Sequence, residues 1–221
     1  MSGSFAEVMA GIVAESQAAR TQGPRRIRTM PATPAPAIDT ATGLIAGVRQ
    51  VICGHCDERP AGAAPTLIVV HGISLPPGQF GGPWIDRLFT GTLPWDAHPY
   101  FRQIEGLRAS AHALIRRDGQ IVQYVPFQLR AWHAGKSEFQ GRSACNDFSI
   151  GIELEGTDEA PYTPAQYASL SALAAALLRT YRSLSEAAIV GHSDIAPGRK
   201  TDPGPSFDWA AFRARLHQEL R

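Results

Sequence analysis

Short apolar runs along the chain predict strands. Residues 66–70 form a continuous run rich in β-branched side chains, which is typical of a buried strand and which ends at His71. A second run, residues 188–190, leads into Gly191 and His192. Both histidines therefore stand just after a predicted strand, from which a rigid element delivers a side chain to a cleft.

A further strand is predicted from strict alternation. In residues 148–155 the isoleucine and leucine side chains share one face, whereas Gly151, Glu153 and Glu155 share the other. The two carboxylates thus face the same space. Side chains two positions apart are separated by about 6.5 to 7 Å along a strand, so only one carboxylate can approach a given atom.

Turn and capping residues indicate a hairpin and two helices. The Asp-Gly pair at 118–119 lies between strand-like runs in residues 111–125 and supplies the positive φ of a tight β-hairpin. Residues 163–166 (TPAQ) form a capping box with proline at the first helical position, and an Ala/Leu-rich stripe continues this helix to Arg182. A last helix is expected at about residues 208–220.

The remaining segments favour irregular structure. Residues 72–101 are rich in Gly and Pro, which predicts a long loop with one helical turn at about residues 84–89. Residues 1–42 are rich in Ala, Pro, Thr, Gly and Arg, which predicts a disordered N-terminal extension with an amphipathic pattern at residues 5–13. The folded domain is expected at residues 43–221. Because strands and helices mix without regular alternation, the predicted fold class is α+β (mixed), with a central mixed β-sheet flanked by helices.

Composition and charge narrow the classes of partner. The 221 residues are 44% hydrophobic, and 21 Lys and Arg against 20 Asp and Glu give a net charge of +1. This balance supplies no strong positive field, so no nucleic-acid partner is expected, and the lack of a run of about 18 apolar residues predicts no membrane span. Residues 1–42 lack the apolar core of a secretory signal, and three cysteines are too few for a disulfide framework. The expected location is the cytoplasm.

Candidate chemistry concentrates in the loop at residues 191–204. This segment contains His192, Asp194 and Asp202 among Pro and Gly residues that disfavour regular structure. Two histidines and a carboxylate would suit zinc, which in catalytic sites has three protein ligands and one open position for water. From the residues alone, His192 is equally well interpreted as a core histidine with a hydrogen-bond partner, and Asp202 as a turn former before Pro203.

Dispersed segments of the chain resemble one enzyme family, the AmpD-type N-acetylmuramoyl-L-alanine amidases, within the wider amidase and peptidoglycan-recognition fold. The similar segments extend over essentially everything from Gly43 onward, which is far more specific than one short motif. They are residues 67–71 (LIVVH), 73–91, 110–127, 130–135 (RAWHAG), 145–158 (CNDFSIGIELEGTD) and 191–209.

The resemblance implies a zinc amidase domain at residues 43–221 and assigns roles to its residues. It implies one zinc ion per chain held by His71, His192 and Asp202, and so selects Asp202 over Asp194. It assigns proton transfer to Glu153 and stabilisation of the oxyanion to Lys200, with Glu155 as a structural rival on the same strand face.

The implied substrate is a muropeptide. The amide to be cleaved joins (1,6-anhydro-)N-acetylmuramic acid to L-alanine, in peptidoglycan recycling. Tyr100, Arg108 and Trp132 are candidate substrate-binding residues, because aromatic rings and a guanidinium suit sugars and peptide carboxylates. His112 and His133 also occupy similar positions, but we expect them to pack or form hydrogen bonds rather than bind metal.

Two departures from the family pattern leave the expected metal ligands intact. Members commonly have Asn directly after the first ligand histidine and a basic residue directly before the Cys145 position, where this chain has Gly72 and Ala144. Both changes bear on peptide binding. The alternatives are a non-catalytic peptidoglycan-recognition module, which would lack a zinc ligand, and an exported amidase that acts on the intact cell wall.

Overall fold

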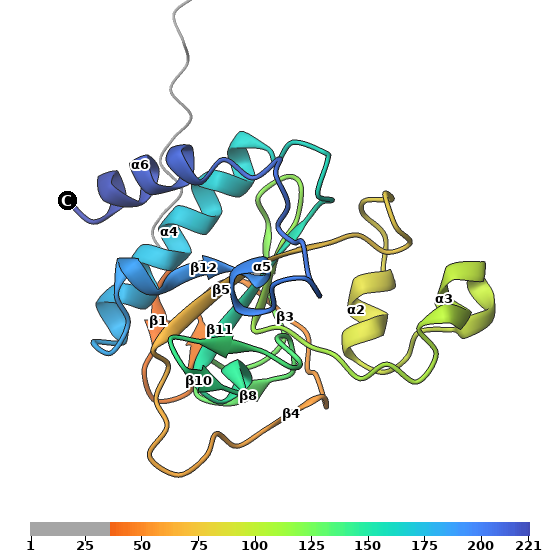
Figure 1. Ribbon diagram of the computed structural model, residues 1–221, viewed down its shortest axis with the longest axis horizontal. Helices are drawn as coiled ribbons and strands as arrows, with labels where there is room; N and C mark the ends of the chain where they lie inside the picture. The colour runs from red at the N-terminus through yellow and green to blue at the C-terminus, as the bar shows by residue number, and fades with distance from the viewer. Residues whose placement is uncertain (1–35) are drawn as a thin grey trace, which may run out of the picture. The chain divides into compact units, whose positions relative to one another are not determined.

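The computed structural model describes residues 36–221 (Figure 1). The predicted extension and its amphipathic pattern at residues 5–13 therefore lie outside the described residues, except at the end of the extension. There, β1 (Ile38–Asp39) pairs antiparallel with β2 (Leu44–Ile45). Regular structure thus begins a few positions before residue 43.

A six-stranded mixed sheet forms the centre of the described fold. Its strand order is β12-β5-β11-β6-β7-β3, with β12, β5, β11 and β6 mutually parallel, β7 antiparallel to β6, and β3 parallel to β7. The predicted mixed sheet is therefore confirmed. The strands are β12 (Ile189–Gly191), β5 (Leu67–Ile73), β11 (Ser149–Glu155), β6 (Ala113–Ile115), β7 (Ile121–Gln123) and β3 (Arg49–Gln50).

Strand β5 extends further than predicted. The apolar run was expected to end at His71, but β5 continues to Ile73 and His71 lies inside it. The reason is non-local, because β11 pairs with β5 through Glu155 and Ile73 and keeps the backbone extended. The predicted hairpin is confirmed: β6 and β7 pair across a turn in which Gly119 has φ of 88°.

Two helices cover one face of the sheet (Figure 1). The capping box of α4 (Pro164–Thr180) is present with both of its hydrogen bonds, and the helix ends two residues before the predicted Arg182. Asp208 caps α6 (Trp209–Glu219) by accepting from the Ala211 N–H. Apolar side chains of both helices pack on the sheet residues that alternate away from Glu153. This core includes Ile68, Val70, Ile150, Ile152, Leu170, Leu173, Phe212 and Leu216.

A long insertion between β5 and β6 packs against the sheet in a second cluster of buried residues. The predicted helical turn is present as α2 (Trp84–Phe89), and it is followed by the 3₁₀ turn η1 (Trp95–Ala97) and by α3 (Pro99–Gln103). The segment is therefore less irregular than predicted. The sequence pattern missed α3 because it has only five residues, capped by the ring of His98 with Pro99 at the first position.

Shorter elements complete the described fold. Two small antiparallel ladders join β4 (Cys56–Asp57) to β8 (Arg130–Ala131) and β9 (Glu138–Phe139) to β10 (Arg142–Ser143). The 3₁₀ turns η2 (Cys145–Asp147) and η3 (Glu186–Ala188) precede β11 and β12. The predicted irregular loop instead opens with the short helix α5 (His192–Ile195). In this part of the chain, no helix is both long enough and apolar enough to cross a membrane.

Candidate metal centre

The sheet order brings three polar side chains together at the carboxyl ends of neighbouring parallel strands. Glu153 on β11 pairs in register with His71 on β5, and Gly191 on β12 pairs with Val70. His192 follows Gly191 directly and so reaches the level of His71. In α/β sheets this edge is where ligands usually bind.

Three donor atoms converge at this edge. The Nδ1 atoms of His71 and His192 are 3.0 Å apart, and Asp202 Oδ2 lies 3.2 Å from the first and 3.1 Å from the second. Asp202 arrives from the loop after α5, where its backbone carbonyl accepts from the Ser193 N–H. The two histidines are 2% and 3% exposed, so the donors are largely shielded from solvent.

Asp194 has a different partner. Its Oδ2 accepts a hydrogen bond of 2.7 Å from the Gly191 N–H, at the start of α5. This cap uses the carboxylate locally and keeps it out of the donor cluster. Within the described part of the chain, His71, His192 and Asp202 are the His, Cys, Asp or Glu residues that are grouped closely enough to bind a metal ion.

The three donors fit a zinc ion. Ligand bonds of about 2.0 to 2.1 Å in a tetrahedral arrangement separate neighbouring donors by roughly 3.3 Å, close to the distances found here. Burial lowers the pKa of His71 to about 4 although Asp202 acts in the opposite direction, so this imidazole is neutral and has a lone pair to donate. Burial acts to raise the pKa of Asp202, but contacts with His192 and His71 outweigh it and keep this pKa well below its usual range.

Glu153 adds a buried polar atom without a protein partner. Its Oε2 has no hydrogen-bond partner among the described residues. Burial and the negative charge of Asp202 raise the pKa of Glu153 well above its ordinary value, whereas Lys200 acts to lower it. A cation held by the three donors would offset this repulsion, which is a second respect in which the site fits a metal.

Glu155 occupies a separate environment on the same strand face. Its carboxylate accepts from the Gly81 N–H at 2.6 Å and the Arg117 N–H at 3.2 Å, and it pairs with Arg116 at 3.3 Å. These contacts attach the insertion and the hairpin to the end of β11. Glu155 is therefore structural in its contacts and does not line the cavity that contains Glu153.

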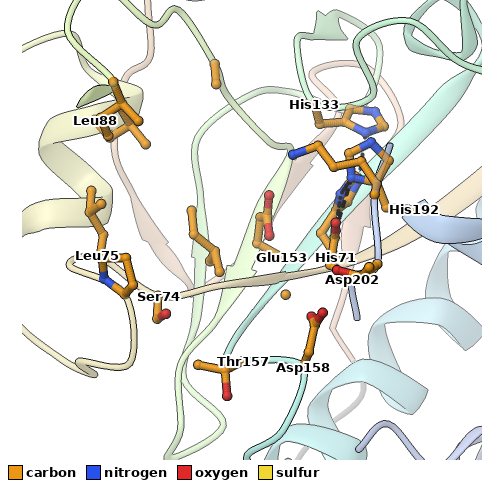
Figure 2. Close-up of a pocket in the computed structure, with 18 of the residues that line it drawn as sticks. His71, Ser74, Leu75, Leu88, His133, Glu153, Thr157, Asp158, His192 and Asp202 are labelled. Carbon is orange, nitrogen blue, oxygen red and sulfur yellow. Dashed lines mark hydrogen bonds and ion pairs between the residues drawn. The ribbon is translucent and has the colours of Figure 1, made fainter. Parts of the chain in front are cut away.

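The donors open onto a cavity of about 650 Å³ with two unlike walls (Figure 2). One wall is polar and comes from the sheet and the loops that follow it, with Thr157, Asp158 and Lys200 beside the donor residues. The facing wall is mainly apolar and comes from the insertion. It comprises Leu75, Leu88, Phe89, Tyr100, Ile104 and Leu107.

The candidate substrate-binding residues lie in three different settings. Tyr100 lines the cavity. Arg108 is exposed between Leu107 and Ala109, which both line the cavity. The Trp132 indole stacks on His55 and donates to Asp57 at 3.2 Å, and it is outside the set of residues that line the cavity.

Two further histidines, His133 and His112, form hydrogen bonds, as expected. His133 also lines the cavity, and its Nδ1 lies 2.9 Å from Nε2 of His71. The Nδ1 of His112 accepts from the Gly151 N–H at 3.0 Å. Sequence reasoning missed Asp158 and Tyr162, of which Tyr162 donates to the Pro203 carbonyl at 2.9 Å, next to Asp202. The sequence feature that could have indicated Tyr162 is the pair Gly72 and Gly156, which leave room for its side chain.

Comparison with known proteins gives a consistent result. The family model described as N-acetylmuramoyl-L-alanine amidase matches residues 61–205, more than half of the chain. The chain is 62% identical over 177 residues to the Escherichia coli K12 protein named 1,6-anhydro-N-acetylmuramyl-L-alanine amidase AmpD, covering 80% of this chain and 96% of that protein. A crystal structure of a selenomethionine AmpD derivative is 61% identical with a TM-score of 0.78, covering 81% of this chain and 98% of that one.

A more distant structure contains a substrate. It is the complex of the amidase AmiD from E. coli with anhydro-N-acetylmuramic acid-L-Ala-D-γ-Glu-L-Lys. The identity is 30% and the TM-score is 0.51, with coverage of 72% of this chain and 60% of that one.

Proposed function

Because the chain belongs to the N-acetylmuramoyl-L-alanine amidase family, we propose that it hydrolyses the amide between (1,6-anhydro-)N-acetylmuramic acid and L-alanine of muropeptides, in peptidoglycan recycling. The relative from E. coli is named for this bond and for the anhydro sugar. The single observation that carries the mechanism is the convergence of three donors beside Glu153, whose Oε2 has no hydrogen-bond partner within residues 36–221.

We propose that zinc is the metal and that His71, His192 and Asp202 hold it. Two imidazoles and one carboxylate are a donor set that zinc prefers, and three protein ligands leave an open position for catalysis. Zinc would supply Lewis acidity there, polarising the amide carbonyl and lowering the pKa of water. The separations of 3.0 to 3.2 Å between donors support this assignment.

Glu153 is the proposed proton carrier. It lies in register beside His71, and its Oε2 is free of protein partners among the described residues. A carboxylate in this position can take the proton of the attacking water and deliver it to the leaving nitrogen of L-alanine. Burial of Glu153 acts to raise its pKa and so makes the carboxylate a stronger base, whereas the charge of Lys200 acts in the opposite direction.

Lys200 is the proposed oxyanion partner. It lines the same cavity two positions before Asp202, and its charge acts on Glu153 and His71. An ammonium group there would stabilise the negative charge that develops on the carbonyl oxygen during attack. The apolar wall of the cavity then supports the parts of the substrate on either side of the amide.

We also propose a cytoplasmic location. All three cysteines, Cys53, Cys56 and Cys145, are free thiols in the structure, although two of them are buried. This usage suits a reducing compartment. It also suits a recycling enzyme that receives small muropeptides rather than the intact cell wall.

The function is tested by hydrolysis and metal content together. Purified protein is expected to contain about one zinc ion per chain, to release the peptide from an anhydro-muropeptide, and to lose activity on chelation. Mass spectrometry of the products identifies the bond, and intact sacculus as a second substrate tests the preference for soluble fragments. Full activity in metal-free protein, or cleavage at another bond, would overturn the proposal.

Two aspartates of the same loop provide a matched pair for this test. Asp202→Ala removes a donor and is expected to bind zinc poorly. Asp194→Ala removes the cap of α5 at a cost of about 1 kcal/mol of stability but leaves the three donors in place. Equal zinc content in the two variants would contradict the proposed ligand set.

A further inference from the structure

Both histidines of the donor cluster use their second ring nitrogen in a hydrogen bond. Nε2 of His71 lies 2.9 Å from Nδ1 of His133, and Nε2 of His192 lies 3.2 Å from the carbonyl oxygen of Ala134. The two acceptors belong to adjacent residues. One short piece of chain, which contributes no donor to the cluster, therefore contacts the far side of both rings.

The side chains of Asn146 and Arg199 hold that piece of chain in place. Oδ1 of Asn146, in η2, accepts from the N–H of His133 at 3.1 Å and from the N–H of Ala134 at 2.8 Å. The Ala134 carbonyl also accepts from Arg199 at 2.7 Å. The orientation of both acceptors thus depends on hydrogen bonds that reach the backbone from two other segments.

Gly151 provides the space for the His133 ring. A methyl group at Gly151 would lie 2.6 Å from both Cδ2 and Nδ1 of that ring, well inside van der Waals contact. Gly151 lies on β11, two positions before Glu153, where the sheet face carries larger side chains at 153 and 155. The ring therefore rests directly on the strand and also reaches Ser149, with Nε2 3.0 Å from its Oγ.

We propose that His133 and Ala134, held by Asn146, form a positioning bracket that fixes which nitrogen of each histidine ligand faces the metal. This inference rests on the proposed function, because it takes Nδ1 of His71 and His192 as metal donors. A neutral imidazole that donates from Nδ1 carries its proton on Nε2, so each ligand needs an acceptor at that side. His133 supplies one through its own unprotonated Nδ1, and the Ala134 carbonyl supplies the other.

The bracket assigns a definite proton to each ring. If Nδ1 of His133 accepts from His71, the proton of His133 is on Nε2 and points to Ser149 Oγ. Donation therefore runs in one direction, from His71 through His133 to Ser149. Moving the His133 proton to Nδ1 would place its N–H against the Nε2–H of His71. His133 is therefore a positioning residue that acts through His71.

Three substitutions of His133 distinguish the contributions of its two ring nitrogens to zinc affinity. His133→Asn keeps an oxygen near the place of Nδ1, His133→Gln keeps a polar group near the place of Nε2, and His133→Leu keeps neither. We expect zinc affinity, measured by competition with a chromophoric chelator, to fall about 10- to 100-fold in the Gln and Leu variants. It should stay within about tenfold of the native value in the Asn variant.

Asn146 gives an independent matched pair. Asn146→Asp keeps oxygen acceptors for the two backbone N–H groups, whereas Asn146→Ala removes them. Zinc affinity should be retained in the Asp variant and reduced in the Ala variant. The unfolding free energy of each metal-free variant is measured alongside, because a merely structural role would lower stability without this ordering of zinc affinities.

The outcomes distinguish this inference from the proposed function. If the native chain binds no zinc, both fail. Suppose instead that the native chain binds zinc tightly. If His133→Leu then binds zinc equally well, or if His133→Asn binds it as weakly as His133→Leu, only the bracket proposal fails. Long-range ¹H–¹⁵N correlation spectra of the zinc-loaded native chain give a test that needs no variant. A proton on Nδ1 of His133 would overturn the proposal, and one on Nε2 would support it.

Discussion

At the scale of single residues, the two carboxylates of β11 differ in what they contact. Among the residues that the structure describes, Glu153 Oε2 has no hydrogen-bond partner, whereas Glu155 accepts hydrogen bonds from the insertion and the hairpin. We expect Glu153→Gln to lower kcat by roughly 10² to 10⁴ because it cannot carry a proton. Zinc content should be unchanged, since Glu153 is not a donor.

Glu155→Gln is the control for this prediction. The substitution replaces the carboxylate, which accepts from two backbone N–H groups and pairs with Arg116, by a neutral amide. We therefore expect a loss of about 1 to 3 kcal/mol in unfolding free energy. Its kcat should stay near the native value at temperatures where the variant is folded. The opposite result, an active Glu153→Gln and an inactive Glu155→Gln, would reassign the proton carrier.

Gly72, directly after a donor residue, is explained by Tyr162. A methyl group at Gly72 would overlap the Tyr162 hydroxyl, which donates to the Pro203 carbonyl and so holds the loop that carries Asp202. We expect Gly72→Ala to cost about 1 to 3 kcal/mol of stability through this overlap. The cost should be smaller in a Tyr162→Phe background, where the hydroxyl is absent.

A double-mutant cycle measured by urea unfolding tests this coupling. Tyr162→Phe alone removes one buried hydrogen bond and should cost about 1 kcal/mol. If Gly72→Ala cost the same free energy with and without the hydroxyl, the overlap would not be the reason for glycine at this position.

At the scale of elements, α2 is attached to the sheet through one aspartate. Asp86 pairs with Arg49 in β3 at 2.7 Å and with Arg116 after β6 at 3.1 Å, and it accepts from the Tyr124 hydroxyl. Burial acts to raise the pKa of Asp86, but hydrogen bonds from Arg49 and Tyr124 and the charge of Arg116 outweigh it, so the pKa is lowered.

This lowered pKa makes the attachment sensitive to acid. A group whose folded pKa is lowered contributes stability above its unfolded value of about 3.9, and the contribution is lost as pH falls through the folded pKa. We expect Asp86→Asn to cost roughly 1 to 3 kcal/mol near pH 6 and progressively less below about pH 4. Urea unfolding across this pH range measures the difference.

Asp96 is the control for Asp86, because its pair with Arg102 is exposed on both sides. Asp96→Asn should cost between 0 and about 1 kcal/mol. A difference between native chain and Asp86→Asn that stayed constant down to pH 3 would contradict the assignment of acid sensitivity to this aspartate.

Elements with local signals were predictable, whereas those that depend on pairing were not. The turn glycine at 119, the capping box before α4 and the alternation of β11 each act within a few residues, and all three are present. The end of β5 was wrong because its partner β11 lies far along the chain. The strand order brings Glu153 and His192 to either side of His71. The pattern of apolar residues predicts the strands but does not indicate which of them are neighbours.

The donor cluster was predictable only in part for the same reason. Strand-end position singled out His71 and His192, but the residues alone did not separate Asp202 from Asp194. The separation depends on the Gly191 N–H, which occupies the Asp194 carboxylate. His133 and Asn146 were not recognised as supports of the ligands, because their contacts join segments that are distant in sequence.

At the scale of the described fold, the donor cluster joins three segments of the chain. His71 comes from the carboxyl end of β5, His192 from the start of α5 and Asp202 from the loop beyond it. These donors converge only in the folded chain, so bound zinc should stabilise the native state by RT ln(1 + [Zn]/Kd), about 2.7 kcal/mol at 100 times Kd.

For a chain of this length, that stabilisation should raise Tm by roughly 5 to 10 °C in scanning calorimetry. The comparison is between zinc-loaded and chelator-treated protein at the same protein concentration. Asp202→Ala should show little zinc-dependent shift, and Asp194→Ala should show the full shift from a slightly lower starting Tm. If zinc did not change the Tm of the native chain, the three donors would not bind the ion in solution. Tight binding to the folded state alone must raise the free energy of unfolding.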